Sequence, residues 1–301
     1  MKIQEILRDF QVSKFSKFLV TLHRHTLGHL IKRISMQAYL EKKYFLSASD
    51  ANAEGELSLT SLTANIIDIA TEHANTLGIG NPAMKDMNAG WILSRITIDM
   101  QSTPKVNTTY ILKTWIEDFN RHYSARCFSI RGEDDKIYGY CRTIWLVIDA
   151  ESHKNLGLSH FSLPQETILG EKAPIPLQEK HFPILDQNSE EDRTKTIRAN
   201  HPAFNYIFRY CDLDFYRHVN TIRYVSLLLN QFTLKEHDET RVCRMELSFL
   251  HEACYGMSTV LLRSDSDEDP LLSSFQLSDE STGQALLFAR IKRMHAHGRD
   301  K

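Results

Sequence analysis

The residues best suited to chemistry lie in one short stretch, 210–224, where acidic, basic and aromatic side chains surround a histidine. Asp214 and His218 are four residues apart, and Asn220 directly precedes an apolar helical pattern. A histidine exchanges protons near neutral pH, and a neighbouring carboxylate can orient it or a water molecule. The stretch therefore indicates general acid–base chemistry, although Asp and Asn are also common near helix starts because they cap them.

The elements around this stretch predict how its side chains are positioned. Residues 204–210 read as a strand, and Ile222, Val225 and Leu229 recur on one face of a helix. Backbone N–H groups in the first helical turn have no intrahelical partner and carry the positive end of the dipole. The start of this helix would therefore stabilise an oxyanion that develops beside His218.

The same pattern of strand, long helix and successive strands occurs twice. The first helix has an apolar face from Leu59 to Leu77, and Gly78 and Gly80 read as its end rather than as a phosphate loop. We expect strands at 37–48, 91–100, 108–119, 123–131 and 138–149, and again at 204–210, 241–250, 259–264, 271–277 and 285–294. This order predicts an α+β fold in which a sheet wraps each helix, and a duplicated unit explains the 301 residues.

Two segments fall outside the repeated units. Residues 161–202 are rich in proline and contain the charged run 189–193, so we expect an interdomain linker. Residues 1–35 carry a net charge of +5 and the rest of the chain −7, and their apolar residues have helical spacing. This predicts a basic amphipathic extension that either binds a membrane surface or partner or packs on the body. His25 and His29 lack a third metal ligand and are expected to be solvated.

Composition excludes several classes of protein. Hydrophobic residues make up 42% and charged residues 25%, which is typical of a soluble globular protein. A net charge of −2 provides no basic excess for nucleic acid, and no integral membrane segment is evident. The five cysteines form no C-x-x-C pair, so we expect free buried thiols, a cytoplasmic location, and neither a metal nor another cofactor.

Several stretches resemble one known family. Residues 212–221 resemble the Asp-Leu-Asp-x-Asn-x-His-Val-Asn-Asn signature of the acyl-ACP thioesterases of plants and bacteria. Residues 90–95 and 144–149 resemble two strands of the family's first domain, and 245–256 is similar to the second-domain strand that supplies a Glu. The resemblance implies two tandem hotdog domains. They would be an N-terminal domain at 36–160 that holds the acyl chain and a catalytic C-terminal domain at 203–296.

The resemblance also implies the site residues. The family's catalytic Asp, His and Glu fall on Asp214, His218 and Glu252, whereas its catalytic Asn falls on Tyr216. A phenol has a longer and more rigid arm than an amide. Tyr216 would therefore place its hydroxyl near the thioester oxygen, hold His218, or leave the role empty. Asn220 matches a family Asn, and we expect it mainly to cap the helix, with a direct role in the site as the alternative.

The implied reaction is hydrolysis of acyl-ACP to a free fatty acid and ACP, which ends fatty-acid elongation. Either Glu252 or Asp214 would act as the base on water, and His218 would orient it and then protonate the leaving thiol. The alternatives are an acyl-CoA thioesterase or another hotdog enzyme such as a dehydratase, and a degenerate acyl-carrier binding module. Plant relatives have a Cys directly after the matching Glu, whereas Cys254 comes one residue later and in a strand would point to the opposite face from that position, so we expect a packed thiol.

Binding residues are implied less directly. Trp91, Ile69, His73 and Leu93 are candidates to line or close an acyl tunnel in the first domain, and each is equally suited to an ordinary core. The carrier protein, the expected partner, is acidic by family expectation. Docking would therefore need a local basic patch, for which the candidates are Arg95, Arg121, Arg217 and Arg223. A homodimer is also compatible with the sequence.

Overall fold

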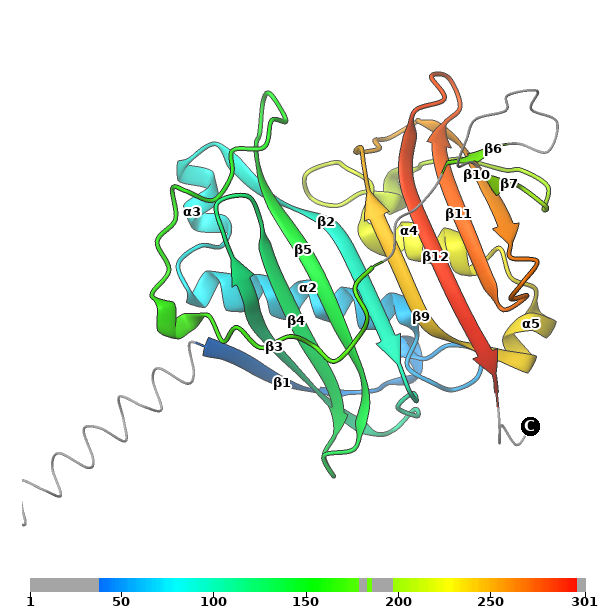
Figure 1. Ribbon diagram of the computed structural model, residues 1–301, viewed down its shortest axis with the longest axis horizontal. Helices are drawn as coiled ribbons and strands as arrows, with labels where there is room; N and C mark the ends of the chain where they lie inside the picture. The colour runs from blue at the N-terminus through cyan, green and yellow to red at the C-terminus, as the bar shows by residue number, and fades with distance from the viewer. Residues whose placement is uncertain (1–37, 179–182, 186–196, 297–301) are drawn as a thin grey trace, which may run out of the picture.

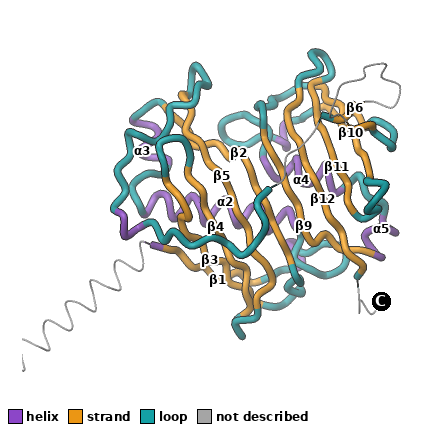
Figure 2. Tube along the Cα trace, viewed as in Figure 1, coloured by secondary structure: helices purple, strands orange, loops and turns teal. Residues whose placement is uncertain are grey.

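A single large sheet dominates the computed structural model, which describes residues 38–178, 183–185 and 197–296. Ten strands form this sheet in the order β1-β3-β4-β5-β2-β9-β12-β11-β10-β8, and every neighbouring pair is antiparallel. The long helices lie along one of its faces (Figures 1 and 2). The predicted extension at 1–35 and the charged run at 189–193 lie outside the described residues.

The elements follow the two predicted repeats. The first contains β1 (Tyr39–Phe45), α2 (Leu59–Thr76), α3 (Asn81–Asp86), β2 (Ala89–Met100), β3 (Thr109–Phe119), β4 (Ser124–Gly132) and β5 (Ile137–Asp149). The second contains β8 (Phe204–Ile207), α4 (Thr221–Leu229), α5 (Leu234–Glu239), β9 (Thr240–Phe249), β10 (Ser258–Asp265), β11 (Leu272–Asp279) and β12 (Ala285–His295). The predicted strands and long helices are confirmed to within a few residues at their ends.

The short elements were not predicted. Helices α3 and α5 have six residues each, too few for a clear apolar period, although Thr233 and Glu236 form a capping box at α5 that the sequence does contain. Within the predicted linker, β6 (Ile184–Leu185) and β7 (Ile197–Arg198) form a parallel pair. Ile184 and Ala199 are buried there against Leu262 of the second repeat.

Helix α2 has a defined cap at its start, which the sequence analysis did not single out, and the end that the sequence predicts. The Ser58 hydroxyl accepts a hydrogen bond from the backbone N–H of Ser61 (3.1 Å) and so caps the N-terminus. At the other end Gly78 has φ of +75°, a conformation that glycine adopts without strain. The interpretation of Gly78 as a helix end is therefore correct. The buried face of α2 contains Leu62, Ile66, Ile69, Ala70 and His73.

The two repeats are joined edge to edge. Strand β2 pairs with β9, so that Arg95 lies opposite Ser248 and Asp99 opposite Arg244. An ion pair between Arg244 Nη1 and Asp99 Oδ2 (2.8 Å) crosses the same junction. One hydrophobic core continues from Ile66 on α2 to Leu228 on α4. The repeats therefore form a single packed body in which the end of β5 lies near the end of β9.

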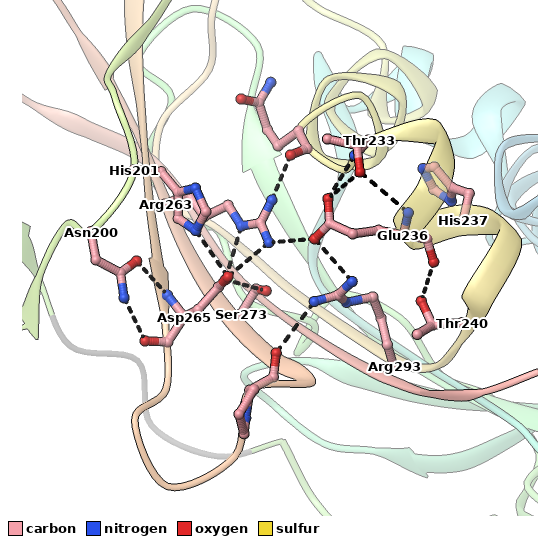
Figure 3. Close-up of polar contacts among 12 residues, drawn as sticks. Asn200, His201, Thr233, Glu236, His237, Thr240, Arg263, Asp265, Ser273 and Arg293 are labelled. Carbon is pink, nitrogen blue, oxygen red and sulfur yellow. Dashed lines mark hydrogen bonds and ion pairs between the residues drawn. The ribbon is translucent and has the colours of Figure 1, made fainter.

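A buried ionic network fixes α5 onto the second half of the sheet (Figure 3). Arg263 and Arg293 each place a guanidinium carbon about 4.5 Å from the centre of the Phe232 ring, and each binds Glu236 Oε1 at 3.0 Å. Arg263 also pairs with Asp265 (2.8 Å). Burial tends to raise the pKa of Glu236, but hydrogen bonds from Thr233 and Arg263 outweigh it and lower the pKa to about 2.

Candidate active site

Asp214 shapes the turn that carries His218. Its Oδ1 accepts hydrogen bonds from the backbone N–H groups of Tyr216 (2.8 Å) and His218 (3.1 Å). Its own N–H donates to the carbonyl of His218 (2.8 Å), and Arg217 within the turn has φ of +68°. The Asp214 carboxylate is thus engaged with the backbone, which directs the chain back toward α4.

Backbone pairing brings His218 and Glu252 together. His218 pairs with Cys254 as an isolated antiparallel bridge, and the N–H of Val219 donates to the carbonyl of Ala253 (2.8 Å). As a result, His218 Nδ1 lies 3.5 Å from Glu252 Oε1. Both side chains remain about one-third exposed, so a substrate can reach them from solvent. Two residues that the sequence places 34 positions apart are therefore neighbours at the surface.

A third side chain at this site comes from the first repeat and was missed by the sequence reasoning. His153 Nδ1 lies 2.9 Å from Glu252 Oε2, and the rings of His153 and His218 are 6.2 Å apart. His153 lies in the turn after β5, which approaches β9 only because β2 pairs with both β5 and β9. No local pattern in the sequence predicts this approach. The positive φ of His153, +56°, is equally invisible in the sequence.

Helix α4 begins at Thr221, three residues after His218. Asn220 is its N-cap, and its side-chain oxygen accepts from the N–H of Ile222 (3.0 Å), which confirms the predicted capping role. The carbonyl of Asp212 accepts from the N–H of Asn220 (2.8 Å), and its buried carboxylate accepts from the Tyr206 hydroxyl (3.1 Å) and from the N–H of Arg209 (2.7 Å). Burial raises the pKa of the Tyr224 hydroxyl in the first turns of α4, and the charge of Glu252 acts in the same direction.

Tyr216 forms part of an exposed aromatic surface together with Phe215. The residue is 51% exposed, and its ring contacts that of Phe215 in a tilted arrangement, with ring centres 4.0 Å apart. In the part of the chain that the structure describes, no hydrogen bond joins its hydroxyl to another residue. The position therefore presents an aromatic rim and not a polar group directed at His218.

The prediction for the cysteines is only partly correct. Cys127 and Cys141 are buried and free, but Cys211 and Cys254 are exposed. The expectation of a packed Cys254 is wrong because β9 ends at Phe249. Beyond that residue the alternation of strand faces no longer decides where a side chain points.

A narrow cavity of about 40 Å³ lies in the first repeat between helices α2 and α3 and strands β2, β4 and β5. Its lining includes Ala70, Thr71, Trp91, Ser124, Arg126 and Trp145. Trp91 is thus the one predicted tunnel residue that lines it. Ile69 is fully buried in the main core, and Leu93 packs against that core.

Arg126 forms a polar wall of this cavity. It is only 4% exposed and donates from Nη1 to Nδ1 of the fully buried His73 (2.7 Å). Across residues 38–178, 183–185 and 197–296, no ion pair joins Arg126 to an acidic side chain. Burial lowers its pKa to about 10, which leaves the guanidinium charged at neutral pH. His73 therefore does not line the cavity itself but binds Arg126, which does.

The described ranges contain no group of three or more His, Cys, Asp or Glu side chains arranged to hold a metal ion, and His25 and His29 lie outside them. The same ranges contain no helix that is both long and apolar enough to cross a membrane.

Comparison with models of known protein families shows which family the chain belongs to. The model of the acyl-ACP thioesterase N-terminal domain matches residues 37–159, and that of the acyl-ACP thioesterase C-terminal domain matches residues 196–292. The chain belongs to the acyl-ACP thioesterase family. The family resemblance inferred from the motifs is thereby confirmed.

Individual relatives of this acyl-ACP thioesterase family member are distant. A palmitoyl-acyl carrier protein thioesterase of Arabidopsis thaliana is 19% identical over 232 residues, which cover 73% of this chain and 53% of the relative. The chain spans about half the length of the curated relatives it matches.

Two solved structures show the fold of the chain. An acyl-ACP thioesterase from Bacteroides thetaiotaomicron superposes with a TM-score of 0.75 at 20% identity and covers 87% of this chain and 99% of its own. A 12:0-ACP thioesterase from Umbellularia californica gives a TM-score of 0.69 at 15% identity, with coverages of 86% and 95%. These likenesses confirm two tandem hotdog domains, each a long helix wrapped by antiparallel strands.

The four arginines suggested for carrier docking are all exposed. Arg217 lies in the Asp214 turn, and Arg223 on α4 donates from Nε to the carbonyl of Cys211 (3.0 Å). Arg95 lies on β2, opposite Ser248 of β9, and Arg121 donates from Nε to His122 (2.8 Å). Arg217 and Arg223 thus lie on the same short segment as His218.

Proposed function

We propose that this family member hydrolyses the thioester of acyl-ACP to a free fatty acid and ACP, which would end fatty-acid elongation. The observation that carries the proposal is the contact between His218 and Glu252 beside the start of α4. In this proposal residues 36–160 hold the acyl chain, 203–296 carry the catalytic groups, and 161–202 connect the two.

The proposed mechanism assigns the base to Glu252. The Asp214 carboxylate already holds two backbone N–H groups, whereas Glu252 has its two oxygens directed at imidazoles and lies partly open to solvent. Glu252 would take a proton from water as the water oxygen attacks the thioester carbonyl. N–H groups at the start of α4 would stabilise the oxyanion, and His218 would protonate the thiolate as the C–S bond breaks.

Tyr216 stands outside this proton transfer in our proposal. Its exposed side chain, whose ring contacts Phe215, supports the interpretation that the role of the family's Asn is empty in this chain. The pair formed by His218 and Glu252 remains in contact despite that substitution. Hydrolysis is therefore favoured over a degenerate binding module.

The proposed acyl site is the cavity between α2 and the first half of the sheet. Its lining by Trp91 and Trp145 offers apolar surface to a fatty chain, while Arg126 presents a charged wall. An apolar chain end accepts no hydrogen bond, so contact with the Arg126 guanidinium would shield its charge further from water without giving it a new polar partner. Arg126 would therefore limit how far the chain can extend in that direction.

The proposed partner is acyl carrier protein, bound near Arg217 and Arg223. An acidic carrier would meet positive charge there although the chain as a whole carries a net charge of −2.

The proposed location is a reducing compartment such as the cytoplasm. The cysteines of the described residues form no disulfide, which supports this location.

One assay tests the proposal. Purified protein is incubated with acyl-ACPs of increasing chain length, and free fatty acids are measured against Glu252→Gln and His218→Ala as matched inactive controls. Release of free acid by the wild type, with a loss of at least about 100-fold in kcat in both variants, supports the mechanism. A 2-enoyl product would indicate a dehydratase, and carrier binding without any product would indicate a binding module.

A further inference from the structure

Glu252 contacts a histidine from each domain, and the shorter of the two contacts is with His153 of the first domain, which does not contain the catalytic motif. Its Oε2 lies 2.9 Å from His153 Nδ1, whereas Oε1 lies 3.5 Å from His218 Nδ1. We propose that His153 is a positioning residue of the active site, which donates Nδ1–H to Glu252 and holds the carboxylate toward His218. This inference rests on the proposed function, because it gives Glu252 the role of the base.

A free Glu252 would be poorly placed for catalysis. Its side chain has several rotatable bonds and is 33% exposed, and β9 ends three residues before it. A hydrogen bond to a carboxylate is shorter and stronger than one between neutral groups. The bond from His153 therefore selects one rotamer and leaves Oε1 directed at His218, in the way that a third group commonly orients a catalytic base.

The turn that carries His153 is itself firmly held. Asp149 Oδ1 accepts from the N–H of Ser152 (2.7 Å) and from its hydroxyl (2.8 Å). The N–H of His153 donates to the carbonyl of Asp149 (3.0 Å), and the N–H of Asp149 donates to the carbonyl of Lys154 (3.0 Å). These bonds place His153 in the left-handed region at φ +56° before any substrate binds. The donor is thus preorganised on a rigid β5 turn.

The contact also depends on how the two domains are joined. Asp149 at the end of β5 pairs with Ala89 at the start of β2, and the other end of β2 pairs with β9. The distance between His153 and Glu252 is therefore set by the backbone ladder that unites the domains. In the proposal, the first domain supplies both the acyl cavity and the group that orients the base.

The backbone conformation at His153 suggests two informative substitutions. His153→Asn keeps a donor near the position of Nδ1, and asparagine tolerates positive φ. His153→Gly removes the donor and is unstrained at the same φ. The turn should therefore persist in both variants. His160→Asn, at an exposed position of the same domain, is the matched control.

Kinetics with acyl-ACP and with a short acyl-CoA thioester separate positioning from binding. We expect His153→Gly to lower kcat roughly tenfold with KM within about twofold of the wild type, since the base is misplaced while the binding surface is unchanged. His153→Asn should recover most of the loss, and His160→Asn should match the wild type. A kcat of His153→Gly equal to that of the wild type would overturn the proposal.

Imidazole nitrogen NMR tests the same inference without turnover. His153→Gly should shift the ring signals of His218, because Glu252 would rotate away, and His153→Asn should leave them near their wild-type values. Unchanged His218 signals in His153→Gly would refute the positioning role even if the protein is an active thioesterase. Conversely, a wild type that hydrolyses no acyl thioester would refute the proposed function, and the NMR result would still decide the contact.

Discussion

The ionic network around Glu236 predicts a specific loss of stability in acid. Glu236→Gln keeps the shape of the side chain but removes the charge that pairs with Arg263 and Arg293, both of which are almost fully buried. One end of the amide is an NH2 group that cannot accept, so either the two guanidinium groups at Oε1 or the N–H of Thr233 at Oε2 loses its acceptor. The variant should therefore unfold more easily at neutral pH.

The magnitude follows from the pKa of Glu236, which is lowered from 4.5 to about 2 in the folded protein. Each pKa unit corresponds to about 1.4 kcal/mol, so the charge stabilises the fold by about 3 kcal/mol at pH 7. The side chain is 28% exposed, and solvent screening reduces the expected value to about 2 to 3 kcal/mol. Because the folded pKa is the lower one, this stabilisation is complete above pH 4.5 and is lost as the pH falls toward 2.

Urea unfolding of the wild type and Glu236→Gln at pH 7 and pH 3 measures this effect. The difference in unfolding free energy should be largest at pH 7 and fall by more than half at pH 3, while the other carboxylates cancel because both proteins contain them. Glu239→Gln is the matched control on the same helix, since its pair with Lys235 is exposed and 3.7 Å long, and we expect a change below about 0.5 kcal/mol. An equal difference at both pH values would refute the reasoning.

Further predictions concern three positions: Tyr216, Arg126 and Arg217. Tyr216→Phe should keep kcat within about twofold because the hydroxyl has no described partner, and a large loss would show that the phenol takes part in the chemistry. Tyr216→Asn, assayed in parallel, should raise turnover if the native site lacks the amide. Arg126→Met should shift the free-acid profile toward longer chains by replacing a charged cavity wall with a flexible apolar one, and an unchanged profile would contradict that role. Arg217→Asn, which tolerates the positive φ, should raise KM for acyl-ACP severalfold and weaken its salt dependence; an equal effect on a short acyl-CoA thioester would argue against carrier docking.

Features that depend on neighbours in the sequence were predictable. The apolar period of α2, the Ser58 cap and the Gly78 end are all local, and each is present in the structure. The turn at Asp214 is also local, because its carboxylate bonds to backbone groups two and four residues later. Helix α5 could have been found from its capping box, since Thr233 and Glu236 are three residues apart.

Features that depend on packing were not predictable. Periodicity identifies the inward face of α2, but it does not separate residues that border the cavity from those that fill the core. Trp91 lines the cavity, whereas Ile69 and Leu93 pack in the core, and the difference arises from how the helices and the sheet meet. Likewise, Cys254 is exposed because β9 ends at Phe249, a boundary that the alternating pattern does not indicate.

The residues of the active site likewise fall into those that local sequence predicts and those that depend on tertiary packing. The sequence by itself determined the duplicated α+β pattern and the motif that carries Asp214 and His218, because apolar period and motif spacing are encoded locally. The family and the tandem hotdog fold followed from the resemblance of those motifs to a known family. Only the tertiary structure decided that His153 meets Glu252 from the other domain. The pairing of β2 with β9 places them side by side, and hydrogen bonds between backbone groups that every residue shares leave little trace in the sequence.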